Sequence, residues 1–275
     1  MRFLLPALTG VLLLSSCKQA EKVDGAPAEQ APEAAAASEE LSGYFPLLPM
    51  IEATLWKQLL AAESRLHGAT ESDHEAAQGE VDRLVEKLRR LHPYEQKPDR
   101  VKLGEVTFDK ARQCFSLPAQ VSYPDPGDER HPGEVELLLC TEGGRRHETL
   151  FVSRARPLHL ELLLHLAGHG KGPNGSRFRM DVITRDGARI AVHDLIRSSE
   201  PVDHPLVWEF SGSDYKDLYS PDLSGDMAIF WHAHESVLRV RHPGIASGVV
   251  KLAPVPHPQL KNGDPVTLEI VPIGT

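Results

Sequence analysis

Basic side chains, cysteines and long apolar segments are all scarce in this sequence. Its 275 residues contain 30 Lys and Arg against 39 Asp and Glu, which gives a formal net charge of −9. This balance argues against a nucleic-acid partner, because binding to phosphates requires a concentrated basic surface. Beyond Cys17, no stretch reaches the roughly 20 apolar residues that cross a bilayer, so no spanning helix is predicted there.

The sequence patterns of common catalytic sites are missing as well. No serine lies in a G-x-S-x-G turn, and neither Cys114 nor Cys140 is placed against an obvious histidine partner. The segment GHGKGPNGS is rich in glycine, but it follows a predicted helix and precedes a predicted strand. This is the reverse of the order in phosphate-binding loops. We therefore expect a protein without catalytic activity.

The N-terminal segment MRFLLPALTGVLLLSSCKQA has the organisation of a secretory signal. Arg2 supplies a positive charge, an apolar run extends from Phe3 to Leu14, and two small serines precede Cys17. This ending resembles the lipobox of bacterial lipoproteins, which implies a signal peptide over residues 1–16 and a lipid on Cys17. The alternative is an ordinary cleaved signal that happens to end near a cysteine.

The lipobox resemblance also implies a location. Two or more acyl chains anchor a protein stably, whereas a single chain is marginal. Lys18 follows the cysteine, where lipoproteins retained in the inner membrane tend to have Asp. We expect a protein of the cell envelope that is anchored in the outer membrane and faces the periplasm. The membrane is then one of its partners, through the N-terminal lipid.

Residues 17–42 form a segment of low complexity after the signal. They are rich in Ala, Glu and Pro and almost free of large apolar side chains. Such a segment cannot bury enough apolar surface to offset the entropy that it loses on ordering. We predict a disordered tether, which holds the folded part of the protein away from the lipid headgroups.

Residues 43–98 carry two helical patterns. Apolar residues recur every three to four positions from Leu48 to Leu66, where Gly68 ends the run, and again from Val81 to Leu91, where Pro93 ends it. We predict an antiparallel helical hairpin. It either packs against the main domain or serves as a coiled-coil handle for oligomerisation.

The pattern changes over residues 101–275, where short apolar or alternating runs are separated by Gly, Pro and Asp-Gly. Candidate strands are Val106–Asp109, Cys114–Tyr123, Glu134–Cys140, Arg146–Val152, Phe178–Thr184, Ile190–Leu195, Leu206–Phe210, Met227–Trp231 and Val266–Val271. One helix interrupts them, with Pro157 in its first turn and Gly168 beyond its end. The predicted class is α+β, with a mostly antiparallel β domain, one inserted helix and a preceding helical hairpin.

The β domain resembles the YdjY-like family of exported bacterial proteins. The resemblance rests on the succession of LLLCTEGG, RRHETLFV and SRARPLHLELLLHLAG, and on the later blocks VWEFSGSDY, LSGDMAIF and PVTLEIVP. Gly144, His147, Glu148 and Pro157 match the family motif, over a region of about 106–272. The family has no established activity. After MAIF this chain departs from the family and reads WHAHESVLRV, so a site there would be peculiar to this protein.

Two cysteines remain if Cys17 carries the lipid. Cys114 and Cys140 are then an even pair in an oxidising compartment, which favours a disulfide. We expect them on neighbouring strands and facing one another, since a disulfide requires Cα atoms within about 7 Å. The alternative is two buried free thiols that behave as small apolar side chains.

The dipeptide His147-Glu148 contains residue types of metal and acid/base sites. The preceding double glycine suggests a hairpin turn with positive φ, after which a regular strand directs His147 and Glu148 to opposite faces. A zinc site of the HEXXH type needs a helix and a second histidine, so it is excluded. We expect Glu148 to pair with an arginine or to cap backbone donors, and His147 to bond a neighbouring loop, unless a β-bulge redirects one of them into a site.

The segment WHAHE suggests a metal site. In an extended chain, His232 and His234 share one face and can chelate a transition metal if a third ligand is supplied elsewhere. Candidate third ligands are His147, His193, His204 and His242. The alternative is a solvent-facing pair of histidines. Glu161 and His165, four residues apart on the predicted helix, are interpreted as an ordinary surface pair.

Together these observations predict a lipid-anchored envelope protein that acts as a non-catalytic binding or structural module. Its partner is an envelope protein or a small ligand that the sequence does not identify. No cofactor is expected under this hypothesis. The alternative hypothesis is a metal-binding or metal-dependent site built on His232 and His234.

Overall fold

The computed structural model describes residues 48–125, 127, 133–172, 175–202, 206–213, 218–232 and 235–274. The chain forms two compact units, one that contains the two long helices and ends at Tyr94, and one that begins at Glu95 and contains the β domain. Within the described residues, no helix combines the length and the apolar character needed to cross a membrane. Cys17 and the signal, the tether and the N-terminal residues of the predicted hairpin lie outside the described residues.

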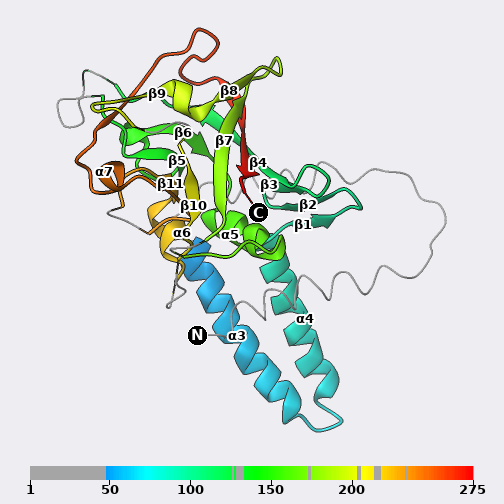
Figure 1. Ribbon diagram of the computed structural model, residues 1–275. Helices are drawn as coiled ribbons and strands as arrows, with labels where there is room; N and C mark the ends of the chain where they lie inside the picture. The colour runs from blue at the N-terminus through cyan, green and yellow to red at the C-terminus, as the bar shows by residue number, and fades with distance from the viewer. Residues whose placement is uncertain are drawn as a thin grey trace. The chain divides into compact units, whose positions relative to one another are not determined.

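The two long helices form the predicted helical hairpin, which Figure 1 shows as α3 and α4. Helix α3 spans Leu48–His67 and α4 spans His74–Leu91. Each buries residues at helical spacing, and these are Trp56, Leu59 and Ala62 in α3 and Val81, Leu84, Leu88 and Leu91 in α4. The two stripes pack on each other, although Met50, Ile51 and Leu60 of α3 stay exposed.

The β domain is built on a closed barrel of eight strands. The described residues of the chain form these strands, of which eight close the barrel: β1 (Tyr94–Gln96), β2 (Arg100–Leu103), β3 (Val106–Asp109), β4 (Cys114–Val121), β5 (Leu137–Thr141), β6 (Thr149–Ser153), β7 (Arg177–Ile183), β8 (Arg189–Ala191), β9 (Ile196–Ser198), β10 (Trp208–Phe210), β11 (Asp226–Ile229), β12 (Leu238–Val240), β13 (Leu252–Pro254) and β14 (Pro265–Pro272). The order around the barrel is β4-β14-β7-β10-β12-β11-β5-β6, and pairing of β6 with β4 closes it. Strands β1 to β3 extend the sheet beyond β4, and β9 pairs with β13.

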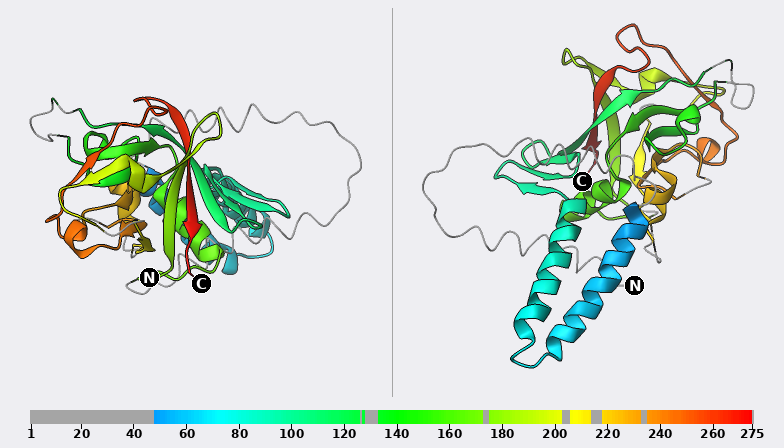
Figure 2. Two further views of the ribbon diagram at one scale, coloured as in Figure 1. Left: turned by 45° about the horizontal axis from the view of Figure 1, so that its top comes forward. Right: turned by 180° about the vertical axis from the view of Figure 1, so that it is seen from behind.

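Strand β14 lies between β4 and β7 in this barrel, and six of its eight residues pair with each neighbour. In Figures 1 and 2 it is the red strand that lies between them. Val266, Leu268 and Ile270 are buried, and they alternate with residues such as Glu269 that point away from the core. Large aromatic side chains fill the interior of the domain, among them Phe115, Phe151, Phe178, Trp208 and Phe210.

Helix α5 confirms the helix predicted after the HET segment, by which we mean residues 147–149. It spans Pro157–Leu166, with proline in its first turn, where the missing N–H has no intrahelical acceptor. Oδ1 of Asp222 accepts a hydrogen bond from the N–H of Leu158 (2.9 Å), and Oδ2 accepts one from Nε of Arg156 (3.0 Å). The other helices are short, and these are η2 (Arg146–Glu148), η3 (Val192–Leu195), α6 (Ser220–Ser224) and α7 (Pro243–Ala246).

The α+β class with a helical hairpin is confirmed, and the sheet is mixed. Strands β5 and β6 run parallel, as do β11 and β12, while the other registered pairs are antiparallel. The predicted hairpin turn between β5 and β6 is therefore wrong. The predicted strand at Arg146 is also wrong over its first three residues, because β6 begins only at Thr149 after the 3-10 turn η2.

The predicted disulfide is not present in the structure. Cys114 and Cys140 are both buried free thiols. Cys114 begins β4 and pairs with Asp109 of β3, whereas Cys140 pairs with Val152 of β6 and lies beside Asp226 of β11. Strands β4 and β5 are separated by β6, so the two cysteines do not face one another as the prediction required.

Candidate binding cleft and the Arg145 cluster

The guanidinium of Arg145 is shared among three carboxylates of the β domain. Its Nη1 lies 3.0 Å from Oε2 of Glu136 and 2.9 Å from Oε1 of Glu148, and its Nη2 lies 3.4 Å from Oδ2 of Asp226. Asp226 is fully buried, and Glu148 is nearly so. We call these four residues the Arg145 cluster. The predicted pairing of Glu148 with an arginine is confirmed.

The Arg145 cluster explains how a short connection can join two parallel strands. Parallel neighbours normally need a crossover of about a dozen residues or more, yet β5 ends at Thr141 and β6 begins at Thr149. Arg145 lies in this return segment, just before η2. Its ion pairs tie the segment to Glu136 before β5 and to Asp226 at the start of β11. These contacts hold the return segment against the barrel.

Two glycines allow a close backbone approach beside this cluster. A Cβ on Gly225 would overlap Oγ1 of Thr141 and lie 2.9 Å from Cα of Gly144, and its φ of +79° lies in the left-handed region that favours glycine. A Cβ on Gly144 would lie 3.0 Å from Cβ of Cys140. The φ of Gly144 is not positive, so this glycine is required for space, and the expected turn conformation is wrong.

His147 and Glu148 do not point apart as strand alternation predicted. Both lie in η2, where side chains do not alternate as they do in a strand, and Nε2 of His147 is 3.5 Å from Oε1 of Glu148. His147 is exposed and Glu148 is buried. The two side chains are therefore in contact at the edge of the Arg145 cluster.

Glu136 is the residue at which two segments singled out by the sequence meet. Its N–H donates to the carbonyl of Glu148 (3.0 Å), and its carbonyl accepts hydrogen bonds from the N–H groups of Phe230 (2.9 Å) and Trp231 (3.3 Å). The HET and WHAHE segments therefore lie on either side of it. Burial and the neighbouring carboxyl of Glu148 raise the pKa of Glu136 above its ordinary value. The neutral form of this carboxyl is thus favoured more than in an exposed glutamate.

A cleft of about 140 Å³ opens beside Glu136. Trp231 forms an aromatic wall and is 38% exposed. Its ring lies against Gly248, where a Cβ would come within 3.2 Å of Nε1. Nζ of Lys251 and Oε2 of Glu134, both lining the cleft, form an ion pair at 3.1 Å. The remaining lining residues are mostly apolar, and these are Val135, Phe230, Ile245, Ser247, Val250 and Leu252.

His232 and His242, two of the histidines considered as metal ligands, bond to the backbone. The Nε2–H of His232 donates to the carbonyl of Val240 (2.8 Å), and burial lowers the pKa of its imidazole. Nδ1 of His242 accepts the N–H of Ile245 (3.2 Å) and so caps α7. Each ring therefore has one nitrogen committed to a structural bond.

The metal hypothesis cannot be built from the described histidines. Nε2 of His193 lies 3.3 Å from Asp194, and His204 and His234 lie outside the described residues. Among the residues that the structure describes, no group of three or more His, Cys, Asp or Glu side chains could hold a metal ion. The site around His232 and His234 stays a prediction.

Glu161 differs most from its sequence interpretation as half of a surface pair. It is fully buried in α5. Its Oε2 accepts hydrogen bonds from the N–H of Ser213 (3.1 Å) and from the hydroxyl of Tyr219. Nε2 of His165 and Nζ of Lys171 lie 3.6 and 3.7 Å from its Oε1. Two donors and two nearby basic groups accompany the buried carboxylate, so we interpret this cluster as a structural connection between α5 and the loops beside it.

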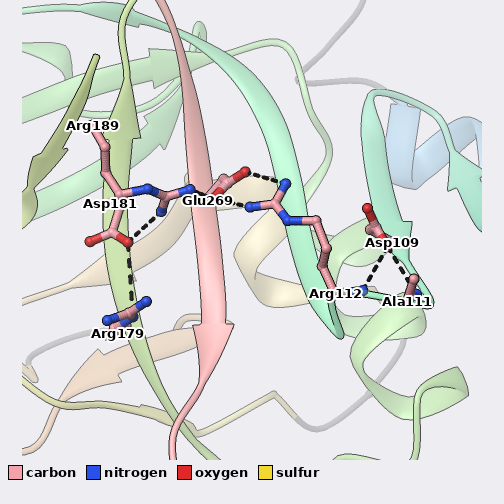
Figure 3. Close-up of polar contacts among 7 residues, drawn as sticks. All are labelled: Asp109, Ala111, Arg112, Arg179, Asp181, Arg189 and Glu269. Carbon is pink, nitrogen blue, oxygen red and sulfur yellow. Dashed lines mark hydrogen bonds and ion pairs between the residues drawn. The ribbon is translucent and has the colours of Figure 1, made fainter. Parts of the chain in front are cut away.

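A second network of charges joins residues of β14, β7 and β8 to the turn before β4, and Figure 3 shows it. Nη1 of Arg112 lies 2.8 Å from Glu269, and Nη1 of Arg189, which also pairs with Glu269, lies 2.6 Å from Asp181. Nε of Arg179 lies 3.8 Å from Asp181. We call these five residues the arginine ladder. Burial alone raises the pKa of Glu269, but the hydrogen bonds from Arg112 and Arg189 outweigh it, and the pKa is lowered.

No family model, no curated protein and no solved structure matches this chain. The resemblance to YdjY-like domains stays a prediction. The structure does show that blocks on which it rests are neighbours. Gly144 lies against Gly225 of the LSGD block, and Arg156, which precedes Pro157, pairs with Asp222 just upstream.

Sequence reasoning missed the residues that form the cleft. Glu136 and Lys251 carry no motif, and they come together only through the pairing of β5 with β11 and the packing of the 245–252 segment. The signal that was available is the pattern around Trp231. A tryptophan at the end of an apolar run, followed by polar residues, indicates an aromatic side chain near the surface.

Proposed function

We propose that this chain is a lipid-anchored protein of the cell envelope and that its β domain is a non-catalytic binding module, with the cleft beside Glu136 as its binding site. The observation that carries the proposal is the cleft itself. Trp231 and the Glu134–Lys251 ion pair line a space of about 140 Å³ whose other walls are mostly apolar. Small-ligand sites combine mostly apolar walls with a few convergent polar groups.

The chemistry of the two described cysteines supports binding over nucleophilic catalysis. Burial raises the pKa of Cys140 to about 12 and raises that of Cys114 as well. Only the thiolate is an effective nucleophile. Both cysteines are therefore neutral thiols near pH 7, and they contribute to packing.

Lipid anchoring is tested by Cys17→Ala in the full chain. We expect the wild type to incorporate radiolabelled palmitate and to sediment with membranes after a high-salt wash, and the variant to do neither, because Cys17 is the residue that the lipobox resemblance marks for the lipid. Cys114→Ala is the matched control and keeps both properties. A Cys17→Ala chain that still sediments with washed membranes would contradict the anchor.

The cleft is tested by nuclear magnetic resonance of the full chain in detergent micelles, with a collection of small fragments of mixed charge. The chain has three tryptophans, and Trp56 and Trp208 are buried whereas Trp231 is partly exposed. We expect some fragments to shift the indole N–H resonance of Trp231 in a saturable way and to leave that of Trp208 unchanged. If no fragment shifts Trp231, the cleft is not the binding site.

A further inference from the structure

The arginine ladder is part of a longer row of charged side chains. Along β7, Arg177 and Arg179 are exposed and alternate with buried residues, so they lie on the outer face of the strand. Arg177 pairs with Glu209 of β10, and Glu209 pairs with Arg239 of β12. Directly opposed residues of antiparallel strands point to the same side of a sheet. The row therefore extends to β12, where Nε of Arg239 lies 2.6 Å from Oε1 of Glu209.

The carboxylates of this row are covered, and its guanidinium groups are exposed. The side chains of Asp181, Glu209 and Glu269 are 7, 8 and 8% exposed. Among the arginines, the exposed fraction of the side chain is 54% in Arg112, 52% in Arg179, 43% in Arg189 and 32% in Arg239, and Arg177 is exposed as well. We call these five arginines the arginine face. It presents positive charge to the solvent.

The positive charge of the arginine face exceeds the negative charge beneath it. Its five arginines accompany three carboxylates among the described residues. Beyond β4, the row adds Arg100 and Lys102 of β2 against Asp109 of β3. Nε of Arg179 lies 3.8 Å from Asp181, which is beyond hydrogen-bond distance. The whole chain has a net charge of −9, so this face has the opposite sign and attracts an anionic partner.

The width of the arginine face favours an extended anionic surface over a single small anion. Its charges are distributed over the neighbouring strands β12, β10, β7 and β14 and the turn before β4. Because adjacent strands lie about 4.8 Å apart, the face is roughly 20 Å wide. Guanidinium groups bind phosphate oxygens through paired N–H donors. A layer of phosphate headgroups can therefore contact several of these arginines at once.

The proposed lipid anchor keeps such a layer within reach. A flexible tether over residues 17–42 has a root-mean-square span of roughly 30 Å. Contact of a tethered domain with its own membrane is intramolecular, so a weak attraction is sufficient. We propose that the arginine face docks on the anionic phospholipid headgroups of the membrane in which the chain is anchored. This inference rests on the lipid anchor of the proposed function.

The experiment uses the full chain in non-ionic detergent micelles at low ionic strength and neutral pH. Phosphatidylglycerol is titrated into the micelles while nuclear magnetic resonance follows the Nε–H signals of Arg112 and Arg189. Phosphatidylcholine, which has the same phosphate but no net charge, is the matched control lipid. We expect saturable shifts with phosphatidylglycerol and little or no shift with phosphatidylcholine. About 1 M sodium chloride should reverse the shifts, because it screens charges beyond about 3 Å.

Two double variants locate the contact. Arg177→Gln with Arg179→Gln removes two exposed charges of the arginine face and keeps the hydrogen bonds of Arg112 and Arg189. We expect the phosphatidylglycerol concentration at half-maximal shift to rise several-fold. Arg83→Gln with Arg197→Gln removes two exposed arginines outside the face, and it is expected to leave this concentration unchanged. If the first double variant does not fold, as judged by circular dichroism, the lipid comparison and the salt reversal in the wild type still decide.

The outcomes separate this inference from the lipid anchor. Equal shifts with the two lipids, or equal weakening by the two double variants, would overturn the docking. If a polyglutamate peptide shifts the same signals and phosphatidylglycerol does not, the face binds an acidic protein and the membrane inference is wrong. A chain that incorporates palmitate but shows no shifts with phosphatidylglycerol keeps its anchor and refutes the docking. Shifts in a chain that incorporates no palmitate would support the anionic surface and refute the anchor.

Discussion

The two charge networks of the β domain use the same residue types in opposite proportions. In the Arg145 cluster one guanidinium contacts three carboxylates, and in the arginine ladder three guanidinium groups contact the carboxylates of Asp181 and Glu269. The pKa of Glu136 is raised in the first network, and that of Glu269 is lowered in the second. Three guanidinium groups serve two carboxylates in the ladder, whereas one guanidinium serves three carboxylates in the cluster. The ratio of arginines to carboxylates therefore goes with the direction in which the pKa of each glutamate moves.

The largest expected effect comes from removing the central arginine of each network. Arg145→Met leaves Asp226 buried without its guanidinium, and breaking a buried pair in this way costs about 3–5 kcal/mol of unfolding free energy. Arg189→Met is the matched change in the ladder. Its side chain is 43% exposed and Glu269 keeps Arg112, so we expect a loss of about 1 kcal/mol or less. Urea unfolding at neutral pH measures both, and equal losses would remove the distinction between the two networks.

A glycine beside each network provides the next comparison. Gly225→Ala introduces a Cβ that overlaps Thr141 and crowds Gly144, at a φ of +79°. Gly187 in the turn between β7 and β8 has a similar φ of +86°, but a Cβ added there would meet nothing within 4 Å. Backbone strain of this kind costs on the order of 1–3 kcal/mol, so we expect a loss near the lower end for Gly187→Ala and near or above the upper end for Gly225→Ala. Thermal unfolding decides, and a larger loss for Gly187→Ala contradicts the crowding.

The pH dependence of stability should have opposite signs at Glu136 and Glu269. A carboxyl with a lowered folded pKa stabilises the protein above its unfolded pKa and loses this contribution as the pH falls through the folded value. A carboxyl with a raised folded pKa contributes below its unfolded pKa and loses the contribution as the pH rises through the folded value. We therefore expect Glu269→Gln to destabilise more at pH 7 than at pH 3. Glu136→Gln should be tolerated better at pH 7 than at pH 4. Urea unfolding of each variant across this range is the measurement, and shifts of the same sign would show that the two sites are alike.

The smallest expected effect concerns the two cysteines, one near each network. Both are free and buried, and the pKa of Cys140 is about 12. We expect no reaction with a water-soluble disulfide reagent in the folded protein at pH 8, reaction of both thiols after unfolding, and no change in melting temperature when a reductant is added. A melting temperature that falls in reductant would restore the disulfide that the sequence suggested.

Local patterns predicted the elements whose formation depends on neighbouring residues. Strand β3 and helix α5 have the bounds that periodicity and Pro157 predicted. The helices of the hairpin follow from apolar spacing and from the stops at Gly68 and Pro93. Strands β12 and β13, with three residues each, are too short for alternation to be recognised.

Pairing between distant segments was beyond local patterns. The closure of the barrel requires pairing of β4 with β6 and β14, and the return segment that lets β6 run parallel to β5 carries the ion pairs of Arg145. A double glycine before alternating residues predicts an antiparallel hairpin. The same local pattern is present here, where the next strand runs parallel, so the pattern does not distinguish the two cases. Glu161 is a second example. Its spacing from His165 on a helix does not reveal that it is buried or that Tyr219 and Lys171 lie beside its carboxylate.

The position of β14 between β4 and β7 leaves two strand edges unpaired while the chain is still folding. Residues 265–270 pair with residues 115–120, so this pairing cannot form until residue 270 has been synthesised. Until then β4 and β7 each present an edge without its central partner, and open edges invite pairing with other chains. A chain cut short before Pro265 is therefore expected to be removed by proteases or to aggregate.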